Sequence, residues 1–198
     1  MVTQLPPTNE IDTEYIVPPF YNNDGTLIQV LCENSSSINS SVGNSVSNFL
    51  LNEKGYKNIE VTSNMTTVIE SDQPVLVTAF GMGSKSNRYH PYMTVVPGIH
   101  QYLDYYKIIV PEGYQENFIC VIVQSQSLNN LRINGFSASH YTSVYQAAVT
   151  LTKHFSIRIF KIQSGTFVLS TTDASQFGLI VNGHRINDGY GFAGNFVH

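Results

Sequence analysis

Six histidines are the side chains of this chain best suited to hold a metal ion or to move a proton. They are His90, His100, His140, His154, His184 and His198. No two of them follow the His-x-His or His-x-x-x-His spacing that places two imidazoles side by side as ligands. A zinc site could be assembled from His90, His100 and Asp104 across one loop, but surface and capping histidines are far commoner. The sequence therefore predicts no metal site.

Nucleophiles and phosphate-binding loops are the next candidates for chemistry. The segment 81–86 follows an apolar run and contains two glycines and a lysine, as a phosphate loop does. It lacks the Gly-Lys-Ser/Thr ending, and the following residues 87–91 cannot open the helix that such a loop needs. No Gly-x-Ser-x-Gly elbow occurs, and no two carboxylates pair for glycoside chemistry. We expect no enzyme and no cofactor.

Tyrosines gather in one stretch and point to binding instead of catalysis. Five tyrosines fall within residues 89–106, beside an asparagine, an arginine and two histidines. Aromatic, amide and arginine side chains are those that protein- and glycan-binding surfaces use, although some of these tyrosines are expected to be ordinary core residues. The predicted binding residues lie on the loop 84–92 and are Asn87, Arg88, Tyr89, His90 and Tyr92.

Two covalent features bear on where the protein resides. Cys32 and Cys120 each stand in an apolar run, which allows two buried free thiols or one disulfide between them. Three segments fit the acceptor pattern for N-linked glycans, with the asparagines at Asn34, Asn39 and Asn64. Because the chain is rich in Asn, Ser and Thr, these sequons support secretion only weakly.

The composition excludes several classes of partner. The 198 residues carry a net charge of −4, and only 12% of them are charged, about half the usual share. The basic residues are scattered, so the sequence predicts no nucleic-acid partner. No apolar stretch approaches the roughly 20 residues that span a bilayer, so we expect no direct membrane insertion.

The elements that must position these side chains are strands. Residues 141–159 alternate between apolar and polar side chains, and this period of two favours paired strands over a helix. Short apolar runs bounded by turn residues also predict strands. These runs cover 27–32, 74–80, 118–123 and 177–181. The predicted fold class is all-β.

An internal repeat organises the strands. Residues 5–18 recur as 95–111, each copy holding a proline, a tyrosine, a short apolar strand and another proline. The run 27–32 lies 91 positions before 118–123, and 61–74 matches 162–177 at an offset near 101. We expect two tandem antiparallel β-sandwich-like units at 1–93 and 94–198, either separate or sharing one core.

Ordered motifs along the chain resemble a known family. The first is Leu5-Pro6-Pro7 followed by Thr13-Glu14-Tyr15-Ile16-Val17-Pro18, and the second is Ile69-Glu70-Ser71-Asp72-Gln73-Pro74-Val75-Leu76-Val77. The chain closes on Asp188-Gly189-Tyr190-Gly191-Phe192-Ala193-Gly194. This ordered set is similar to the N-terminal region of IgGFc-binding proteins. The chain departs from the family by lacking cysteines near residues 81–90 and by carrying Ala193 where proline is common.

The resemblance implies a place and a kind of function. Proteins of this family are secreted and mucus-associated, and they are often joined to von Willebrand type D modules. The resemblance therefore implies a non-enzymatic extracellular adhesion or recognition module that binds protein or glycan within a larger secreted or cell-surface protein. A self-assembly module of a matrix or mucus-like polymer and a lectin-like domain are the alternatives, because a fold does not fix its ligand. In the motifs themselves, Tyr15 and Tyr106 have the size and the polar tip to anchor a strand against a loop.

Overall fold

A computed structural model describes residues 11–62 and 64–194, and most of these residues lie in strands. The first seven strands are β1 (Asp12–Val17), β2 (Thr26–Cys32), β3 (Ser36–Val42), β4 (Ser45–Leu51), β5 (Tyr56–Val61), β6 (Thr67–Gly81) and β7 (Tyr92–Val95). The others are β8 (Tyr105–Val110), β9 (Glu116–Gln124), β10 (Leu131–Ile133), β11 (Phe136–Ser137), β12 (Ser143–Thr150), β13 (His154–Ile162), β14 (Gly165–Thr171), β15 (Phe177–Arg185) and β16 (Asp188–Ala193). The predicted all-β class is confirmed.

Helical structure in the described segments is limited to short 3-10 turns. These are η2 (Ile99–Gln101), η3 (Ser125–Asn130) and η4 (Ala138–His140). Within residues 11–62 and 64–194, no helix has the length and apolar character needed to cross a membrane.

The seven-stranded sheet is built around the long strand β6. Its first half, residues 67–71, pairs with β1 and β3, and its second half, residues 75–81, pairs with β2 and β7. The two halves meet at Asp72-Gln73-Pro74, where proline has no N–H to give to a ladder. The Asp72 carboxylate accepts hydrogen bonds of 2.9 Å from the Ser36 hydroxyl and the Ser37 amide. The strand expected at 74–80 therefore begins earlier, at Thr67, and it continues through the proline within one sheet.

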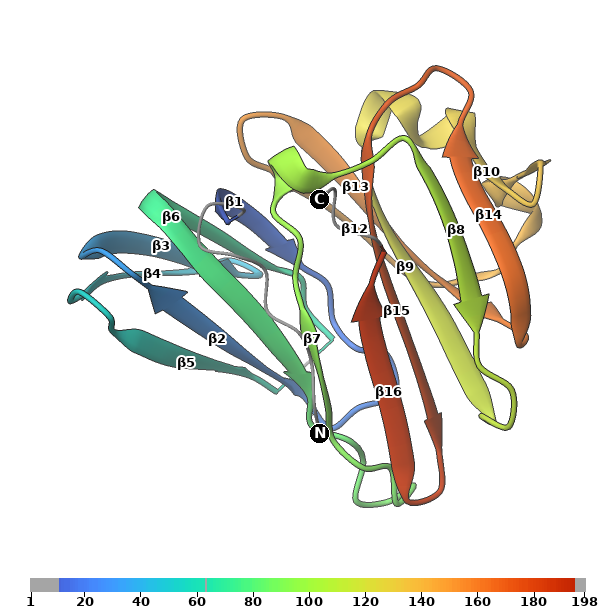
Figure 1. Ribbon diagram of the computed structural model, residues 1–198, viewed down its shortest axis with the longest axis horizontal. Coiled ribbons are helices and arrows are strands. Elements are labelled where there is room, and N and C mark those ends of the chain that lie inside the picture. The colour runs from blue at the N-terminus through green and yellow to red at the C-terminus, as the bar shows by residue number, and fades with distance from the viewer. Residues whose placement is uncertain (1–10, 63, 195–198) are drawn as a thin grey trace.

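The second half of the chain forms two more sheets (Figure 1). The four-stranded sheet has the order β11-β10-β14-β8, and the five-stranded sheet has the order β12-β13-β9-β15-β16. The five-stranded sheet lies in the middle. Alternate residues of β9 enter two different hydrophobic clusters, with Phe118 and Cys120 in one and Ile119 and Val121 in the other. Burial on both faces explains why β9 reads as an unbroken apolar run.

Paired strands form where the sequence alternates with a period of two. β12 pairs antiparallel with β13, with Gln146 opposite Arg158 and Thr150 opposite His154. Ala147 and Val149 pack against the larger cluster, while Gln146 and Ala148 are exposed. The prediction of strands over 141–159 is confirmed.

Two tyrosines make the same pair of hydrogen bonds in the two halves. The Tyr15 hydroxyl accepts from the Asp12 amide at 2.8 Å and donates to the carbonyl of Val75. The Tyr106 hydroxyl accepts from the Leu103 amide at 3.0 Å and donates to the carbonyl of Phe177 at 2.6 Å. Burial raises the pKa of both phenols, so each remains a neutral donor at physiological pH. Tyr15 thus fastens the start of β1 to β6 within one sheet, whereas Tyr106 fastens the segment before β8 to β15 in a different sheet.

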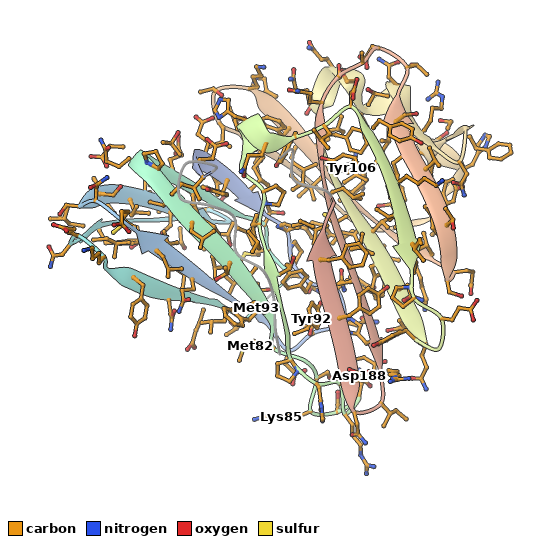
Figure 2. The ribbon with its side chains drawn as sticks, in the orientation of Figure 1. Met82, Lys85, Tyr92, Met93, Tyr106 and Asp188 are labelled. Atoms are coloured by element: carbon orange, nitrogen blue, oxygen red, sulfur yellow. The ribbon has the colours of Figure 1, made fainter. Side chains whose placement is uncertain are left out.

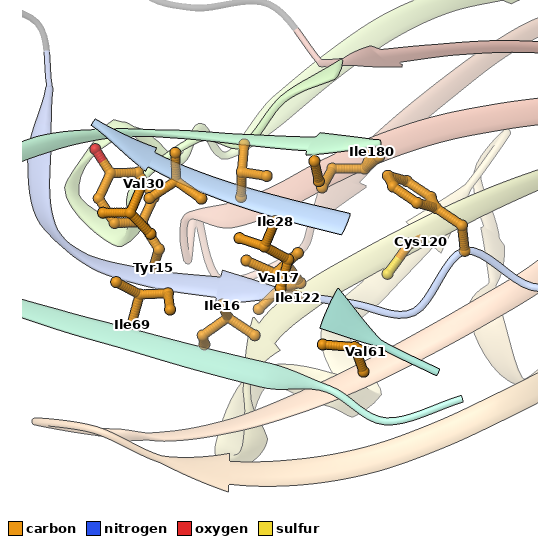
Figure 3. Packing of buried hydrophobic residues seen from close by; sticks show 14 of the residues in the cluster. Tyr15, Ile16, Val17, Ile28, Val30, Val61, Ile69, Cys120, Ile122 and Ile180 are labelled. Atoms are coloured by element: carbon orange, nitrogen blue, oxygen red, sulfur yellow. The ribbon is translucent and has the colours of Figure 1, made fainter. Parts of the chain in front are cut away.

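Strand order is also the same in the two halves, except that β12 has no counterpart in the first half. The path β4-β3-β6-β1 of the first half corresponds to β11-β10-β14-β8, and β5-β2-β6-β7 corresponds to β13-β9-β15-β16. The single strand β6 takes the places of both β14 and β15. The division into units at 1–93 and 94–198 stays a prediction, and β7 spans that boundary. The larger hydrophobic cluster holds residues of both ranges, and Figure 3 shows Cys120, Ile122 and Ile180 beside Val17 and Ile28.

Candidate binding surface on the loop between β6 and β7

The loop 82–91 is held in one conformation by the turn at residues 22–25. Within the loop, Ser84 and Tyr89 exchange backbone hydrogen bonds of 3.2 and 2.9 Å. The Asn23 side chain accepts from the amide of Gly83 at 2.8 Å, and the Asp24 carboxylate accepts from the amide of Lys85 at 2.9 Å. Short polar side chains at a tight turn therefore hold the base of the loop, which is why the pattern Asn-Asn-Asp-Gly precedes β2.

Arg88 occupies a strained position at the tip of this loop. Its backbone φ is 57°, in the left-handed region that side chains with a Cβ avoid. The carbonyl of Arg88 accepts a 2.8 Å hydrogen bond from the amide of Asn187 in the turn between β15 and β16. Asn87, Arg88 and His90 are all exposed. The fold thus fixes the backbone of the tip while leaving these side chains in solvent.

Tyr89 and His184 form the layer beneath the tip. Their rings stack with centroids 4.9 Å apart and planes 9° apart, and Tyr89 is half-buried. His184 is fully buried, and its Nε2 lies 3.1 Å from the carbonyl of Tyr21. Burial lowers the pKa of the imidazole, against smaller opposing effects of the Tyr21 carbonyl and the Glu116 carboxylate. The neutral imidazole is therefore the form that supports Tyr89 at neutral pH.

Tyr92 does not belong to the surface. It is only 2% exposed, and burial raises the pKa of its phenol. Its ring lies where a Cβ on Gly189 or Gly191 would approach it to 2.9 or 2.6 Å, so β16 admits the ring only because it carries glycine there. Figure 2 shows Tyr92 between β7 and β16. We therefore correct the predicted set by removing Tyr92, whose side chain cannot contact a partner from this position.

The other tyrosines of the 89–106 stretch are not brought to the loop. Tyr102 and Tyr106 are buried, with the Tyr102 ring over Gly178. Tyr105 is exposed, but it lies on β8 in the four-stranded sheet. Neighbours in sequence are separated here because successive residues of a strand face opposite sides.

The turn between β15 and β16 adds residues that sequence reasoning missed. Arg185 and Asp188 form a salt bridge of 2.8 Å, and the Tyr114 hydroxyl donates to the same carboxylate at 3.0 Å. Ile186 at the turn and Met82 at the start of the loop are exposed apolar side chains. Figure 2 shows Lys85 and Asp188 at the same end of the molecule. The turn residues Asn187-Asp188-Gly189 were a signal for the hairpin, but not for its contact with Arg88.

Both cysteines are buried free thiols in the structure. The Cys32 thiol donates to the carbonyl of Asn52 at 3.1 Å, and burial raises the pKa of Cys120. The sequence allowed either two buried free thiols or one disulfide between Cys32 and Cys120. The structure has the two free thiols.

The three sequons differ in accessibility. Asn34 and Asn64 are exposed. Asn39 is half-buried in β3, where its Nδ2 donates to Glu70 at 3.2 Å and its Oδ1 is buried. Attachment of a glycan needs a free Nδ2, so Asn34 and Asn64 are the better candidates.

The histidines considered as metal ligands lie apart. His100 pairs with Asp12, with Nδ1 and Oδ1 2.8 Å apart, whereas His90 is exposed on the loop. His198 lies outside the described residues. Over 11–62 and 64–194, no three His, Cys, Asp or Glu side chains gather as a metal site would require.

Comparison with known proteins gives one family. The family model described as IgGFc binding protein matches residues 1–183. No curated protein matches the chain. The matched range includes the loop 82–91 and all strands up to β14.

Proposed function

The chain belongs to the IgGFc-binding protein family, and from this membership we propose that it is a non-enzymatic extracellular module that recognises a protein partner through the loop 82–91. The observation that carries the proposal is Arg88, an exposed cation on a strained backbone that two neighbouring segments hold in place. Strain of this kind persists where the surrounding structure imposes it, and it is concentrated at binding and catalytic sites.

The chemistry of the loop suits a protein partner. Asn87, Arg88 and His90 present amide, guanidinium and imidazole groups to solvent, and Tyr89 adds part of an aromatic face. Arginine and tyrosine are enriched among the residues that contribute most to protein interfaces. The exposed Met82 at the start of the loop supplies apolar area. This mixture favours a protein surface over a sugar, for which an open aromatic platform would be needed.

Preorganisation is the physical advantage of this arrangement. A flexible loop loses about 0.5–1.5 kcal/mol for each rotamer-rich side chain that binding immobilises, and more when its backbone must also be ordered. Here the Ser84–Tyr89 bridge and the Asn187–Arg88 hydrogen bond order the backbone before binding. Side-chain ordering is then the main entropic cost that remains.

The test is a binding screen with a matched pair of variants. The purified chain is screened against extracellular proteins, with IgG Fc included because the family description names it, and against glycans. Arg88→Gly removes the cation and relieves the strain. Lys54→Gly is the control, because Lys54 is also exposed and also has a left-handed backbone, with φ 56°.

We expect a protein ligand whose affinity falls at least tenfold with Arg88→Gly and is unchanged with Lys54→Gly. Equal binding by both variants would exclude the loop 82–91 as the binding site. Binding to glycans alone would support the lectin-like alternative.

A further inference from the structure

The edge strand β12 lies at the junction of the two halves of the chain. Tyr145, near one end of the strand, is joined to Thr66 by a 2.9 Å hydrogen bond. Just beyond the other end, the Thr152 hydroxyl donates to Glu14 at 3.2 Å. Between these two bonds, β12 packs against the hydrophobic cluster that holds residues of both halves. The strand therefore runs along the face of β1 and of the first half of β6 that carries Glu14.

The hydrogen bonds of β12 show which of its backbone groups face β13. The Arg158 guanidinium, on β13, donates to the carbonyl of Ala147 at 3.5 Å and to that of Ile157, the residue opposite, at 2.9 Å. One side-chain nitrogen reaches both carbonyls only if they lie between the two strands, so the backbone groups of Ala147 face β13. Successive residues of an antiparallel strand direct these groups to opposite sides. Gln146 and Ala148 therefore direct theirs away from β13.

Nothing in the described part of the chain pairs with this free side of β12. Among the described strands, β13 is its one ladder partner, and no backbone hydrogen bond joins Gln146 or Ala148 to another segment. Proteins commonly protect such an edge with charged side chains, prolines or bulges. β12 contains no charged residue and no proline, and its one shift of register lies at its start, between Ser143 and Tyr145. The edge is therefore open to a further strand.

A groove of about 400 Å³ follows the free side of β12, and we call it the β12 groove. One wall is β12 itself, with lining residues from 145 to 150, and the turn between β3 and β4 lines the opposite side. The floor is formed by Ser41 on β3 and by Val68 and Glu70 on β6, which share one face of the sheet. None of the described β13 residues lines the groove. It thus lies where an additional strand of the five-stranded sheet would lie.

The floor of the β12 groove continues onto β4 as an accessible apolar surface. Val46 on β4 stands opposite Ser41, which stands opposite Val68, so the three side chains share one face. Val46 is 64% exposed, and Met65, which also lines the groove, is 40% exposed. A strand beside β12 would direct every second side chain at this floor. The floor therefore suits an extended segment whose alternate side chains are apolar.

Two carboxylates beside the groove favour a basic residue in that segment. Glu70 stands directly opposite Glu14, and like charges in such a pair repel each other. Their hydrogen-bond donors are neutral groups, the Asn39 amide for Glu70 and the Thr152 hydroxyl for Glu14. Neither carboxylate belongs to a salt bridge among the described residues. Because β12 has no basic residue, pairing with β12 of a second copy would leave this charge unmatched.

We propose that β12 accepts an extended segment of a partner protein as an additional strand. The segment pairs with the free backbone groups of Gln146 and Ala148, directs alternate apolar side chains at Val46 and Val68, and places a lysine or arginine at Glu70. Main-chain hydrogen bonds supply affinity in this mode of recognition, and the alternate side chains supply specificity. The proposal goes beyond the proposed function because it uses the β12 groove and not the loop 82–91.

A phage library of random short peptides, selected on the purified chain, provides the probe. Each selected peptide is synthesised with one backbone N–H at a time replaced by N-methyl, and its affinity is measured by fluorescence polarisation. Only alternate amides of an added strand face β12. Methylation should therefore lower the affinity at least tenfold at every second residue and leave it unchanged at the residues between. This measurement alters the peptide alone, so it does not depend on how a protein variant folds.

Three protein variants locate the binding site. Glu70→Gln removes one carboxylate beside the groove, and Glu60→Gln is the matched control, because Glu60 is exposed on β5. Arg88→Gly alters the loop 82–91. We expect the selected peptides to carry a lysine or arginine, and to lose about fivefold in affinity with Glu70→Gln, the upper end for a partly exposed ion pair. Glu60→Gln and Arg88→Gly should leave their affinity unchanged.

Several results would overturn strand addition at β12. They include a selection that yields no peptide, a sensitivity to methylation without the period of two, and equal losses with Glu70→Gln and Glu60→Gln. Peptides that show the period of two but ignore Glu70→Gln would pair with a different edge. Peptides weakened by Arg88→Gly alone would bind the loop 82–91, which would support the proposed function while refuting this one.

Discussion

Removing the hydroxyl of Tyr106 should destabilise the protein far more than removing that of Tyr105, its neighbour on β8. Tyr106→Phe keeps the ring, which packs edge-on against Phe177 with centroids 4.9 Å apart. It deletes the acceptor of the Leu103 amide and the donor to the Phe177 carbonyl. Tyr105 is 52% exposed.

The magnitude follows from the partners that are left behind. A typical buried hydrogen bond contributes about 1 kcal/mol net, and a buried group left without a partner costs roughly 1–3 kcal/mol. Phe177 is completely buried, so its carbonyl cannot turn to water, whereas Leu103 is half-buried and its amide is less costly to strand. We expect Tyr106→Phe to lower the free energy of unfolding by about 2–4 kcal/mol, and Tyr105→Phe by less than about 0.5 kcal/mol.

Urea unfolding followed by circular dichroism measures both values, with an unchanged slope showing that the native state stays as compact. Tyr15→Phe provides an independent repeat of the measurement, because its hydroxyl makes the same two kinds of bond in the first half. A loss for Tyr106→Phe no larger than for Tyr105→Phe would refute the view that the Tyr106 hydroxyl fastens β8 to β15.

Three further predictions concern His184, Gly191 and the sequons. Burial lowers the pKa of His184 in the folded protein, so as the pH falls below about 6.5 the unfolded chain binds a proton at this histidine before the folded protein does. The free energy of unfolding should therefore decline towards pH 5 more in the wild type than in His184→Gln. Urea titrations at each pH would measure this difference. Gly191→Ala brings a Cβ to 2.6 Å from the Tyr92 ring and should cost about 1–3 kcal/mol, a loss visible as a lowered melting temperature. In secreted material, mass spectrometry of glycopeptides should find a glycan at Asn34 and none at Asn39, whose Nδ2 is bonded to Glu70.

Local patterns predicted the elements well because strand formation here follows alternation and turn chemistry. The period of two at Ala147 and Val149 gave β12, and the two tyrosine motifs gave side chains with the expected anchoring bonds. The alternation and the tyrosine motifs are carried by residues close together in the sequence, so the sequence alone is enough to find them. The carbonyls that the two tyrosines bond, those of Val75 and Phe177, lie 60 and 71 residues further along the chain and were not predicted.

The binding surface was less predictable because it depends on contacts between distant segments. From the sequence alone, Tyr92 was predicted to be an exposed loop residue. Its ring is buried because Gly189 and Gly191, almost 100 residues later in the chain, leave room for it. Likewise, the backbone of Arg88 is held by a hydrogen bond from the distant amide of Asn187. Glycines in a strand mark a close approach of some kind, but they do not say which side chain approaches.

The pairing of β6 also sets which parts of the molecule open first. β6 shares ladders with β1, β2, β3 and β7, so no single neighbouring strand can leave and expose its amides along the whole length. By contrast, β12 lies at the edge of its sheet and has β13 as its one ladder partner among the described strands. Amide hydrogens along β6 should therefore exchange with solvent only when the whole protein unfolds, whereas those of β12 exchange through local fraying. The edge strand that flanks the junction of the two halves is thus less rigid than the strand at the centre of the seven-stranded sheet.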